Sequence, residues 1–444
     1  MSFKLRDYQV EPADRLEQLL RDYPGAADLS DMGTGKTYVA CETIRRRDKP
    51  TLVVAPKVSI SAWEDVGRQV GAEFDVINWE KLRTGRTPYG RWLVYRKQRM
   101  ANGTTREFKK FVWAPEVGDV YFDEAHVASG ENSQNGLMVR AAVTAGKTVT
   151  NITATPADSP LQLRAMGYTL GLHDDRDFWN WCLKHGCYKA PFGGLGFTED
   201  EDRAASIMAR LNEQIAPRSV RIRIEDLPPG AMPDVIFDAP LIDIDERAEI
   251  DRMHGDLRAA LQEIEEKGLK GGAEDHPMTR ALRARQRIEL LHVPGWIDLA
   301  QQRLDAGRSV LFFVSFSATI AALHAAFPTF GIIDGAHVDS RSDDLAALQA
   351  DRIRGLIANQ QAGGVALSAQ DIIGKHPRTS IISAVGVRAR DVIQCGGRTR
   401  RNGSKSTPEV LIPVAAGTVE VKIKKRVDKK KLCIDSLLDG DLTL

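Results

Sequence analysis

Ser30-Asp31-Met32-Gly33-Thr34-Gly35-Lys36-Thr37 is the stretch that decides the fold of this 444-residue chain. Its glycines let the backbone curl so that successive N–H groups face one phosphate. Lys36 is placed to reach the β- and γ-phosphates, and the Thr37 hydroxyl is placed for Mg²⁺. The residues that follow have helical spacing, so the dipole at the start of that helix would strengthen the anion site. The general pattern has glycine where this chain has Ser30, and a glycine-rich turn beside a solvated lysine is the alternative. The predicted phosphate-binding residues are Gly33, Thr34, Gly35, Lys36 and Thr37.

A second motif, Asp119-Val120-Tyr121-Phe122-Asp123-Glu124-Ala125-His126, follows the phosphate loop in the chain. Its apolar residues predict a strand, and two carboxylates stand where this strand ends. Beside a phosphate loop, Asp123 would hold Mg²⁺ through water, and Glu124 would orient and deprotonate an attacking water. A strand that merely exposes charge to solvent is the alternative, and the order of the two motifs favours the catalytic interpretation.

The rest of the first half alternates strand-like and helix-like segments. Apolar β-rich runs are separated by stretches with helical spacing, such as Tyr38–Arg47. This alternation predicts a parallel sheet covered on both faces. The runs are Thr51–Ala55, Phe74–Asn78, Asp119–Phe122 and Thr148–Thr153.

The same rhythm returns after a proline-rich break. Asp226–Pro233 contains three prolines and a glycine, which neither a helix nor a central strand accepts. We therefore expect two α/β lobes, at 1–225 and 241–444, joined by a linker over 226–240. A helical insertion at 245–300 and a basic helix at the C-terminus are expected in the second lobe. Its predicted strands are Ser309–Ser315, Gly331–Ile333, Gly355–Ala358 and Thr379–Ser383.

A basic motif in the second lobe, Gln394-Cys395-Gly396-Gly397-Arg398-Thr399-Arg400-Arg401, suits a phosphate ligand. The guanidinium group is always charged, and its planar fork grips phosphate oxygens in pairs. Supplied from a second lobe, it would stabilise charge that builds on a γ-phosphoryl group, an effect worth about 10³–10⁵ in rate. We expect Arg401 in this role, with Arg398 beside it. A solvated basic surface is the alternative.

The segment Arg91–Trp113 predicts a basic, aromatic hairpin. It has seven basic residues against the single acid Glu107, and Asn102-Gly103 in its middle is a turn signal. Such a hairpin would grip phosphates and stack on bases, with Arg96, Lys97 and Arg99 as the phosphate contacts. A hairpin whose charges only keep an exposed edge soluble is an equal alternative. The interleaved aromatic residues are Trp92, Tyr95, Phe108, Phe111 and Trp113.

The net charge, the cysteines and the absence of long apolar runs limit the partners and the cellular location that we expect. A formal net charge of +1 gives no global basic field, so nucleic-acid binding must rest on local patches. The five cysteines include no CxxC pair, which indicates reduced thiols. Cys182, His185 and Cys187 are close together, but no second ligand pair has zinc-site spacing. We find neither a signal peptide nor a membrane-length apolar run, so a soluble, cytoplasmic protein is expected.

Together these motifs resemble the superfamily 2 helicases of DEAD/DEAH type, and most closely the Swi/Snf-like branch. The match runs in order along nearly the whole chain. In motif V, Ala366 replaces a usual glycine. Beyond the phosphate loop and the Asp-Glu-Ala-His strand, the matching segments are Leu5–Gln9 ahead of the loop, Ala55-Pro56-Lys57 followed by Trp63 (motif Ia), Thr153–Pro156 (motif III), Val310–Phe316 (motif IV), Gly363–Ser368 (motif V) and Gln394–Arg401 (motif VI).

The resemblance implies two tandem RecA-like parallel-sheet lobes, with an ATP site in the cleft between them. ATP and Mg²⁺ would be the cofactors, with Thr37 and Asp123 as metal ligands and Gln9 as a contact to adenine. Gln394, Arg398 and Arg401 would complete the catalytic set with Lys36, Asp123 and Glu124. The implied nucleic-acid contacts are Pro56, Lys57, Thr153, Thr155, Gly363, Gly364 and Ser368.

The expected activity is that of a DNA-stimulated ATPase, a helicase or translocase that moves on duplex or branched DNA. An RNA helicase, and a nucleotide-gated clamp with slow hydrolysis, remain as alternatives. Because one chain carries both sets of ATPase motifs, a monomer suffices. The compact length resembles motors of phages or prokaryotes, and no protein partner can be named from the sequence.

Overall fold

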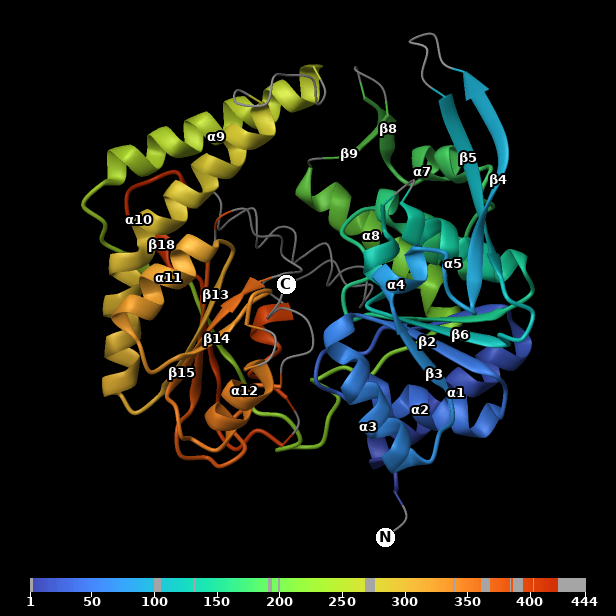
Figure 1. Ribbon diagram of the computed structural model, residues 1–444, viewed down its shortest axis with the longest axis horizontal. Coiled ribbons are helices and arrows are strands. Elements are labelled where there is room, and N and C mark those ends of the chain that lie inside the picture. The colour runs from blue at the N-terminus through green and yellow to red at the C-terminus, as the bar shows by residue number, and fades with distance from the viewer. Residues whose placement is uncertain are drawn as a thin grey trace. The chain divides into compact units, whose positions relative to one another are not determined.

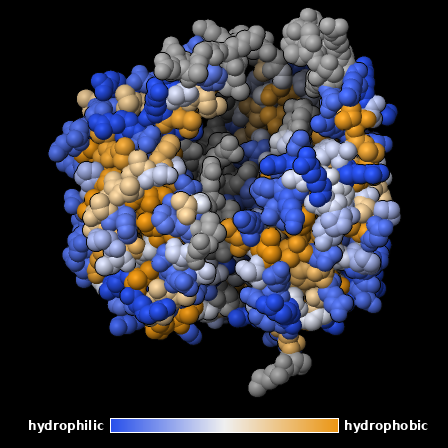
Figure 2. Space-filling view, viewed as in Figure 1, coloured by the Kyte–Doolittle hydropathy of each residue, from blue (hydrophilic) through white to orange (hydrophobic). Residues whose placement is uncertain are grey.

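The computed structural model describes residues 3–99, 105–130, 133–190, 194–198, 200–267, 276–337, 340–360, 368–383, 385, 394–401 and 403–421. They form two compact units, and the chain passes from the first unit to the second between Leu227 and Pro228. Figure 1 shows the helices and strands of each unit. Figure 2 shows mostly hydrophilic residues, with smaller apolar patches, on the viewed face of both units.

The first unit is built on a sheet of six parallel strands with helices on both faces. Along β2 the side chains alternate: Val53 packs with helices α1, α2 and α3 on one face, and Leu52 and Val54 pack with α4, α5 and α6 on the other. The predicted two-faced sheet is confirmed. In sheet order, the strands are β10 (Ser219–Val220), β1 (Gly25–Asp28), β7 (Thr148–Ile152), β6 (Asp119–Asp123), β2 (Thr51–Ala55) and β3 (Asp75–Asn78). The helices are α1 (Asp7–Asp22), α2 (Lys36–Arg47), α3 (Ile60–Val70), α4 (Trp79–Arg83), α5 (Gln134–Thr144), α6 (Arg164–Thr169), α7 (Phe178–Lys184) and α8 (Glu201–Ile215).

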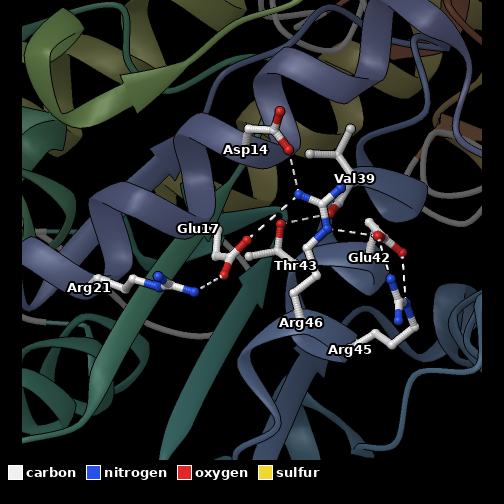
Figure 3. Close-up of polar contacts among 8 residues, drawn as sticks. All are labelled: Asp14, Glu17, Arg21, Val39, Glu42, Thr43, Arg45 and Arg46. Carbon is white, nitrogen blue, oxygen red and sulfur yellow. Dashed lines mark hydrogen bonds and ion pairs between the residues drawn. The ribbon is translucent and has the colours of Figure 1, made fainter.

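A network of charged side chains fastens α2 to α1 (Figure 3). Arg46 of α2 forms ion pairs with Asp14 and Glu17 of α1 and with Glu42 of its own helix. Arg45 donates to the Glu42 carboxylate over 2.7 Å, and this hydrogen bond is the main cause that holds the pKa of Glu42 below its usual value. The network fixes the helix that carries Lys36 against the helix that carries Gln9.

Two hairpins lie outside the main sheet of the first unit. Strands β4 (Gly90–Arg99) and β5 (Thr105–Trp113) pair antiparallel over the segment where a hairpin was predicted. They form a two-stranded sheet of their own, so this hairpin is not an edge of the central sheet. The second pair is β8 (Cys187–Lys189) with β9 (Leu195–Phe197).

The second unit repeats the parallel architecture with another six-stranded sheet. All six residues of its central strand β13 are buried, as the continuous apolar run predicted. Part of the segment expected as a linker joins this sheet, because Ile236–Asp238 pairs with Glu409–Leu411. In sheet order, the strands are β11 (Ile236–Asp238), β17 (Glu409–Leu411), β16 (Arg378–Ile382), β13 (Ser309–Val314), β15 (Gly355–Asn359) and β14 (Gly331–Ile333). A further pair joins β12 (Leu241–Ile242) to β18 (Val414–Ala415).

Helices of the second unit pack on this sheet and on one another. The long helices α9 (Arg247–Lys267) and α10 (Pro277–Asp305) pack side by side (Figure 1). Buried Glu289 of α10 accepts hydrogen bonds from Ser315, Phe316 and Thr319, and so satisfies donors at the start of α11 (Ser317–Ala326). The remaining helix is α12 (Arg341–Gln349).

A buried ionic cluster ties α9 and α10 to the last described turn of the chain. The Nε2 atoms of His254 and His292 lie 3.1 and 2.8 Å from the two carboxylate oxygens of Glu420. These contacts hold the pKa of Glu420 down at about 2, against the effect of its burial, and Glu420 raises the pKa of His292. With a parallel sheet in each unit, the predicted fold of two RecA-like lobes is confirmed. The basic C-terminal helix predicted beyond Val421 lies outside the described residues.

Candidate nucleotide-binding site

The phosphate loop joins the end of β1 to the start of α2. Gly33 and Gly35 have φ angles of 80° and 95°, in the left-handed region that glycine adopts without strain. A Cβ atom on Gly35 would lie 2.2 Å from the side-chain nitrogen of Gln9. Glycine is therefore required at position 35 for two reasons, its backbone conformation and its close neighbour.

Ser30 replaces the usual first glycine and has a structural task here. Its backbone N–H donates to Asp28 Oδ1 over 2.9 Å, and its hydroxyl accepts the backbone N–H of Ile222 over 2.9 Å. The next residue, Asp31, accepts from Arg221 and from the backbone of Ile224. These bonds attach the loop to the segment that follows β10. The departure from the general pattern therefore adds one bond to the loop, that of the Ser30 hydroxyl with Ile222.

Lys36 begins α2, and its ammonium group is held by the loop itself. Nζ donates to the carbonyl oxygens of Ser30 and Asp31 over 2.8 and 3.1 Å. Burial lowers the pKa of Lys36, and the carboxylates of Asp28, Glu124, Asp31 and Asp123 oppose that shift. The ammonium group of Lys36 thus interacts electrostatically with carboxylates of the loop and of the acidic strand end.

Gln9 of α1 is buried against the loop, with both ends of its amide in use. Oε1 accepts the backbone N–H of Arg6 over 3.1 Å, and Nε2 donates to the carbonyl of Thr34 over 2.9 Å. The residue predicted to contact adenine therefore also fixes the backbone of the phosphate loop.

Asp123 ends strand β6, two strands away from β1 in the sheet. Oδ2 accepts the indole N–H of Trp63 over 2.9 Å, and Oδ1 accepts the backbone N–H of Glu124 over 3.0 Å. Trp79 donates to the Asp123 carbonyl over 3.0 Å. Burial, followed by the neighbouring Glu124, raises the pKa of Asp123 to about 6. Two donors therefore orient the carboxylate, and the third, from Trp79, holds the main chain of the same residue.

Glu124 is turned out of the strand direction, with a φ of 50° that is unusual for a residue other than glycine. Its carboxylate lies 3.3 Å from His126 Nδ1, which in turn lies 3.2 Å from Thr153 Oγ1. Thr153 donates its backbone N–H to the Asp28 carbonyl over 3.0 Å. A chain of polar contacts therefore runs across the sheet edge from the acidic strand end to the strand that carries the phosphate loop.

The motif III threonines are buried and hydrogen-bonded within the first unit. Thr153 and Thr155 were predicted to contact nucleic acid, but they are only 1% and 0% exposed. The Thr153 hydroxyl instead accepts the backbone N–H of Thr155 over 3.1 Å and faces His126. These hydrogen bonds connect parts of the site within the first unit, and the contact of both threonines with nucleic acid stays a prediction.

Pro56 and Lys57 follow β2 at the same edge of the sheet. Pro56 is half-buried, and Lys57, exposed, begins the short 3₁₀ helix Lys57–Ser59. Arg96 and Lys97 lie on strand β4 of the hairpin, where Lys97 pairs with Glu107 over 3.1 Å. The backbone of Arg99 pairs with Thr105, and its side chain lies outside the described residues.

The basic motif of the second unit is held by local contacts. Arg401 donates from Nη1 to the Ser368 hydroxyl over 2.9 Å, and the Ala369 N–H donates to the Arg398 carbonyl over 3.0 Å. Arg398 and Gln394 are 4% and 6% exposed. The structure thus brings Ser368 together with Arg398 and Arg401 within this unit. Gly363 and Gly364, the other predicted motif V contacts, lie outside the described residues.

The structure also shows functional candidates that sequence reasoning did not single out. Trp79, which donates to the Asp123 main chain, was not predicted, and Trp63 was noted only as part of a motif. Asp28 is fully buried at the end of β1, where burial raises its pKa and Lys36 opposes that shift. The residues next to a buried tryptophan or aspartate in the sequence do not indicate which side chains it will contact in the fold.

Comparison with known proteins gives a clear relative. A "Putative ATP-dependent RNA helicase" of Acanthamoeba polyphaga mimivirus is 28% identical over 461 aligned positions, which cover 99% of this chain and 85% of the relative. The chain is helicase-like. No family model matches it.

One solved structure aligned with this helicase-like chain is described as "Sulfolobus solfataricus SWI2/SNF2 ATPase core in complex with dsDNA". It is 15% identical, with a TM-score of 0.36, and the alignment covers 100% of this chain and 94% of that one. Because this TM-score is low, the fold assignment rests on the sheet topology of each unit. No helix among the described residues is long and apolar enough to cross a membrane. Over the same ranges, His, Cys, Asp and Glu form no group of three or more suited to a metal ion.

Proposed function

We propose that this helicase-like chain is an ATP-driven motor that moves on DNA, with duplex or branched DNA as its track. The observation that carries the proposal is the grouping at one edge of the first sheet, where β1, β7 and β6 are neighbours. Lys36 follows the first of these strands, and Asp123 and Glu124 end the last. The polar contacts of Thr153 and His126 join the two ends.

This grouping supplies the parts that ATP hydrolysis requires. Lys36 and the loop N–H groups would bind the β- and γ-phosphates, and the lysine would exchange its two carbonyl contacts for phosphate oxygens. Thr37 and Asp123 offer oxygen ligands, the donors that Mg²⁺ prefers. A bound Mg²⁺ would neutralise charge on the phosphates. Glu124, held beside His126, would orient and deprotonate the attacking water.

We further propose that the second unit completes the ATPase with Gln394, Arg398 and Arg401. The hydrogen bond from Arg401 to Ser368 supports this idea, because it links the arginine to motif V, a segment expected to contact nucleic acid. A change in the state of either ligand could then be transmitted through that bond. Since one chain carries all these residues, a monomer suffices.

An RNA helicase is the second candidate, and the name of the mimivirus relative favours it. The basic hairpin and exposed Lys57 suit the phosphates of either nucleic acid, so these residues do not decide between DNA and RNA. A nucleotide-gated clamp is a third candidate. Slow turnover that does not respond to any nucleic acid would favour it.

The deciding experiment is an ATPase assay with the full chain and Mg²⁺. Turnover is measured alone and with single-stranded, duplex, forked and four-way DNA, and with the matching RNA forms, all at one salt concentration. We expect the greatest stimulation by duplex or branched DNA. Stimulation by RNA alone would replace DNA as the track, and a chain without ATPase activity under every condition would overturn the motor.

A further inference from the structure

The β4–β5 hairpin is anchored at its base by a ladder of aromatic rings. Trp92, Phe111 and Trp113 are stacked edge to face, with ring centroids 5.1 and 5.2 Å apart. Trp113 continues the ladder to Phe122 of the central sheet. The two indole N–H groups donate to the carbonyl oxygens of Arg83 and Met138. Phe111 and Trp113 are each only 4% exposed, so they belong to the core that anchors the hairpin.

Two glycines allow this anchor to pack tightly. A Cβ atom on Gly90 would lie 2.4 Å from the Phe111 ring, and one on Gly85 would lie 2.5 Å from the Trp92 ring. Gly85 also has a positive φ of 64°. The hairpin base is therefore fixed to the first unit.

The hairpin changes character at a bulge. Val94 pairs with Lys109 and Arg96 pairs with Phe108, so Tyr95 is an extra residue between the two pairs. A bulge of this kind re-aims a side chain. Tyr95 is 63% exposed, the second-highest exposure among the large hydrophobic residues of the described chain. Its ring centroid lies 6.4 Å from that of Phe108.

Positive charge surrounds exposed Tyr95 and half-buried Phe108. The Arg96 guanidinium lies 5.4 Å from the centre of the Phe108 ring. Lys97 and Lys109 both reach Glu107, at 3.1 and 3.3 Å, and are themselves largely exposed. Lysines alone would keep an exposed edge soluble. They do not explain a tyrosine turned into solvent beside a second ring and an arginine.

An exposed tyrosine beside a half-buried phenylalanine, among basic side chains, matches one ligand chemistry, a nucleotide whose base is free to stack. Base–aromatic stacking combined with phosphate contacts is how single strands are bound without sequence preference. Inside a duplex, each base is already stacked between neighbours and cannot reach a side chain. The ligand must therefore offer an unpaired base.

We propose that Tyr95 and Phe108 form a stacking platform for an unpaired base, with Lys97 and Lys109 on its phosphates. The hairpin would thus select nucleic acids in which paired and unpaired strands meet. This inference deepens the proposed function and rests on it for the presence of a nucleic-acid track. The opposing idea is that Leu93, Val94 and Tyr95 form a docking face for a second copy of this chain.

The test measures the affinity of the full chain, without nucleotide, for a blunt DNA duplex and for a forked duplex. Tyr95→Ala should weaken fork binding on the order of tenfold, and Tyr95→Phe should retain it, because only the ring is needed. Duplex affinity and the salt dependence of binding should change little, since no phosphate contact is lost. Trp92 is unsuitable for this test because its substitution would disturb the anchor.

A second fork separates stacking from a general loss of fold. Abasic sites in the unpaired arm should weaken wild-type binding as much as Tyr95→Ala does, and the two changes together should cost no more than either alone. Equal losses on duplex and fork, a Tyr95→Phe variant as weak as Tyr95→Ala, or additive losses would overturn the platform. A dimer that Tyr95→Ala dissociates, with fork binding unchanged, would assign this face to a second copy. Binding is measured without ATP, so the result does not depend on ATPase activity. An inactive ATPase would therefore refute the proposed motor without changing the interpretation of the binding data.

Discussion

The indole N–H of Trp63 lies 2.9 Å from Oδ2 of Asp123, a tryptophan of α3 clamped onto the carboxylate that we propose as a metal ligand. Trp63 is 1% exposed and packs edge to face on Phe74. Its place in the core therefore fixes the direction of this hydrogen bond. Because Oδ1 is held by the Glu124 backbone, the Asp123 side chain has little freedom to rotate.

We expect Trp63→Phe to raise the Mg²⁺ concentration needed for half-maximal ATPase activity. The phenyl ring keeps most of the packing and removes the donor, and a hydrogen bond to a charged group is worth about 1.5–3 kcal/mol. Turnover at subsaturating Mg²⁺ should fall by roughly tenfold or more. Trp113→Phe is the matched control, because that indole donates to the Met138 carbonyl instead. If both variants share one Mg²⁺ dependence, Trp63 has only a packing role.

Substitutions of Lys36 and Glu124 should impair ATP binding and turnover in different ways. Lys36→Ala removes the ammonium group that now bonds to the carbonyls of Ser30 and Asp31, so it should weaken ATP binding as well as turnover. Glu124→Gln keeps the shape and removes the base, so it should bind ATP normally and lose about 10²–10⁴ in turnover. Binding of a fluorescent ATP analogue, measured beside steady-state turnover, separates the two. A Glu124→Gln chain with normal turnover would remove this residue from the chemistry.

Some of the site could be predicted because its signals are local. The phosphate loop and the strand that ends in Asp123 each carry their chemistry within eight consecutive residues, and parallel strands bring their carboxyl ends to one edge. The bond from Ser30 to Ile222 spans most of the first unit, and no local pattern announces it. The hairpin aromatics show a different limit. Their alternation could not reveal that the bulge at Tyr95 divides anchored rings from exposed ones.

Arg401→Ala should leave ATP binding nearly intact and reduce stimulated turnover by about 10³-fold or more, the range for an arginine that stabilises phosphoryl transfer. Arg400→Ala is the control within the same motif, because Arg400 donates to the Pro233 carbonyl. Ser368→Ala, which removes the hydroxyl bound by Arg401, tests the coupling. It should lower nucleic-acid stimulation more than basal turnover. Near-normal stimulated ATPase in Arg401→Ala would exclude this arginine from the mechanism.

The cluster of His254, His292 and Glu420 predicts how the stability of the second unit depends on pH. Glu420 has a pKa lowered to about 2. Its contribution, on the order of 3 kcal/mol, is present above the unfolded-state pKa and is lost as pH falls toward 2. His292 has a raised pKa, because its hydrogen bond with Glu420 outweighs burial, and buried Glu289 adds in the same direction. The stabilisation that His292 contributes is fully present below the unfolded-state pKa of about 6.5. It is lost as the pH rises through the folded-state pKa of His292.

Thermal unfolding of the full chain should therefore show a transition of the second unit that is most stable between about pH 4.5 and 6.5. Glu420→Gln should lower that transition and flatten its pH dependence, since both histidines lose their charged partner. The transition of the first unit, which holds none of these residues, is the internal control. His292→Gln should abolish the decline on the alkaline side and leave the acid side in place. A Glu420→Gln chain with an unchanged pH profile would show that this buried cluster does not carry the pH dependence.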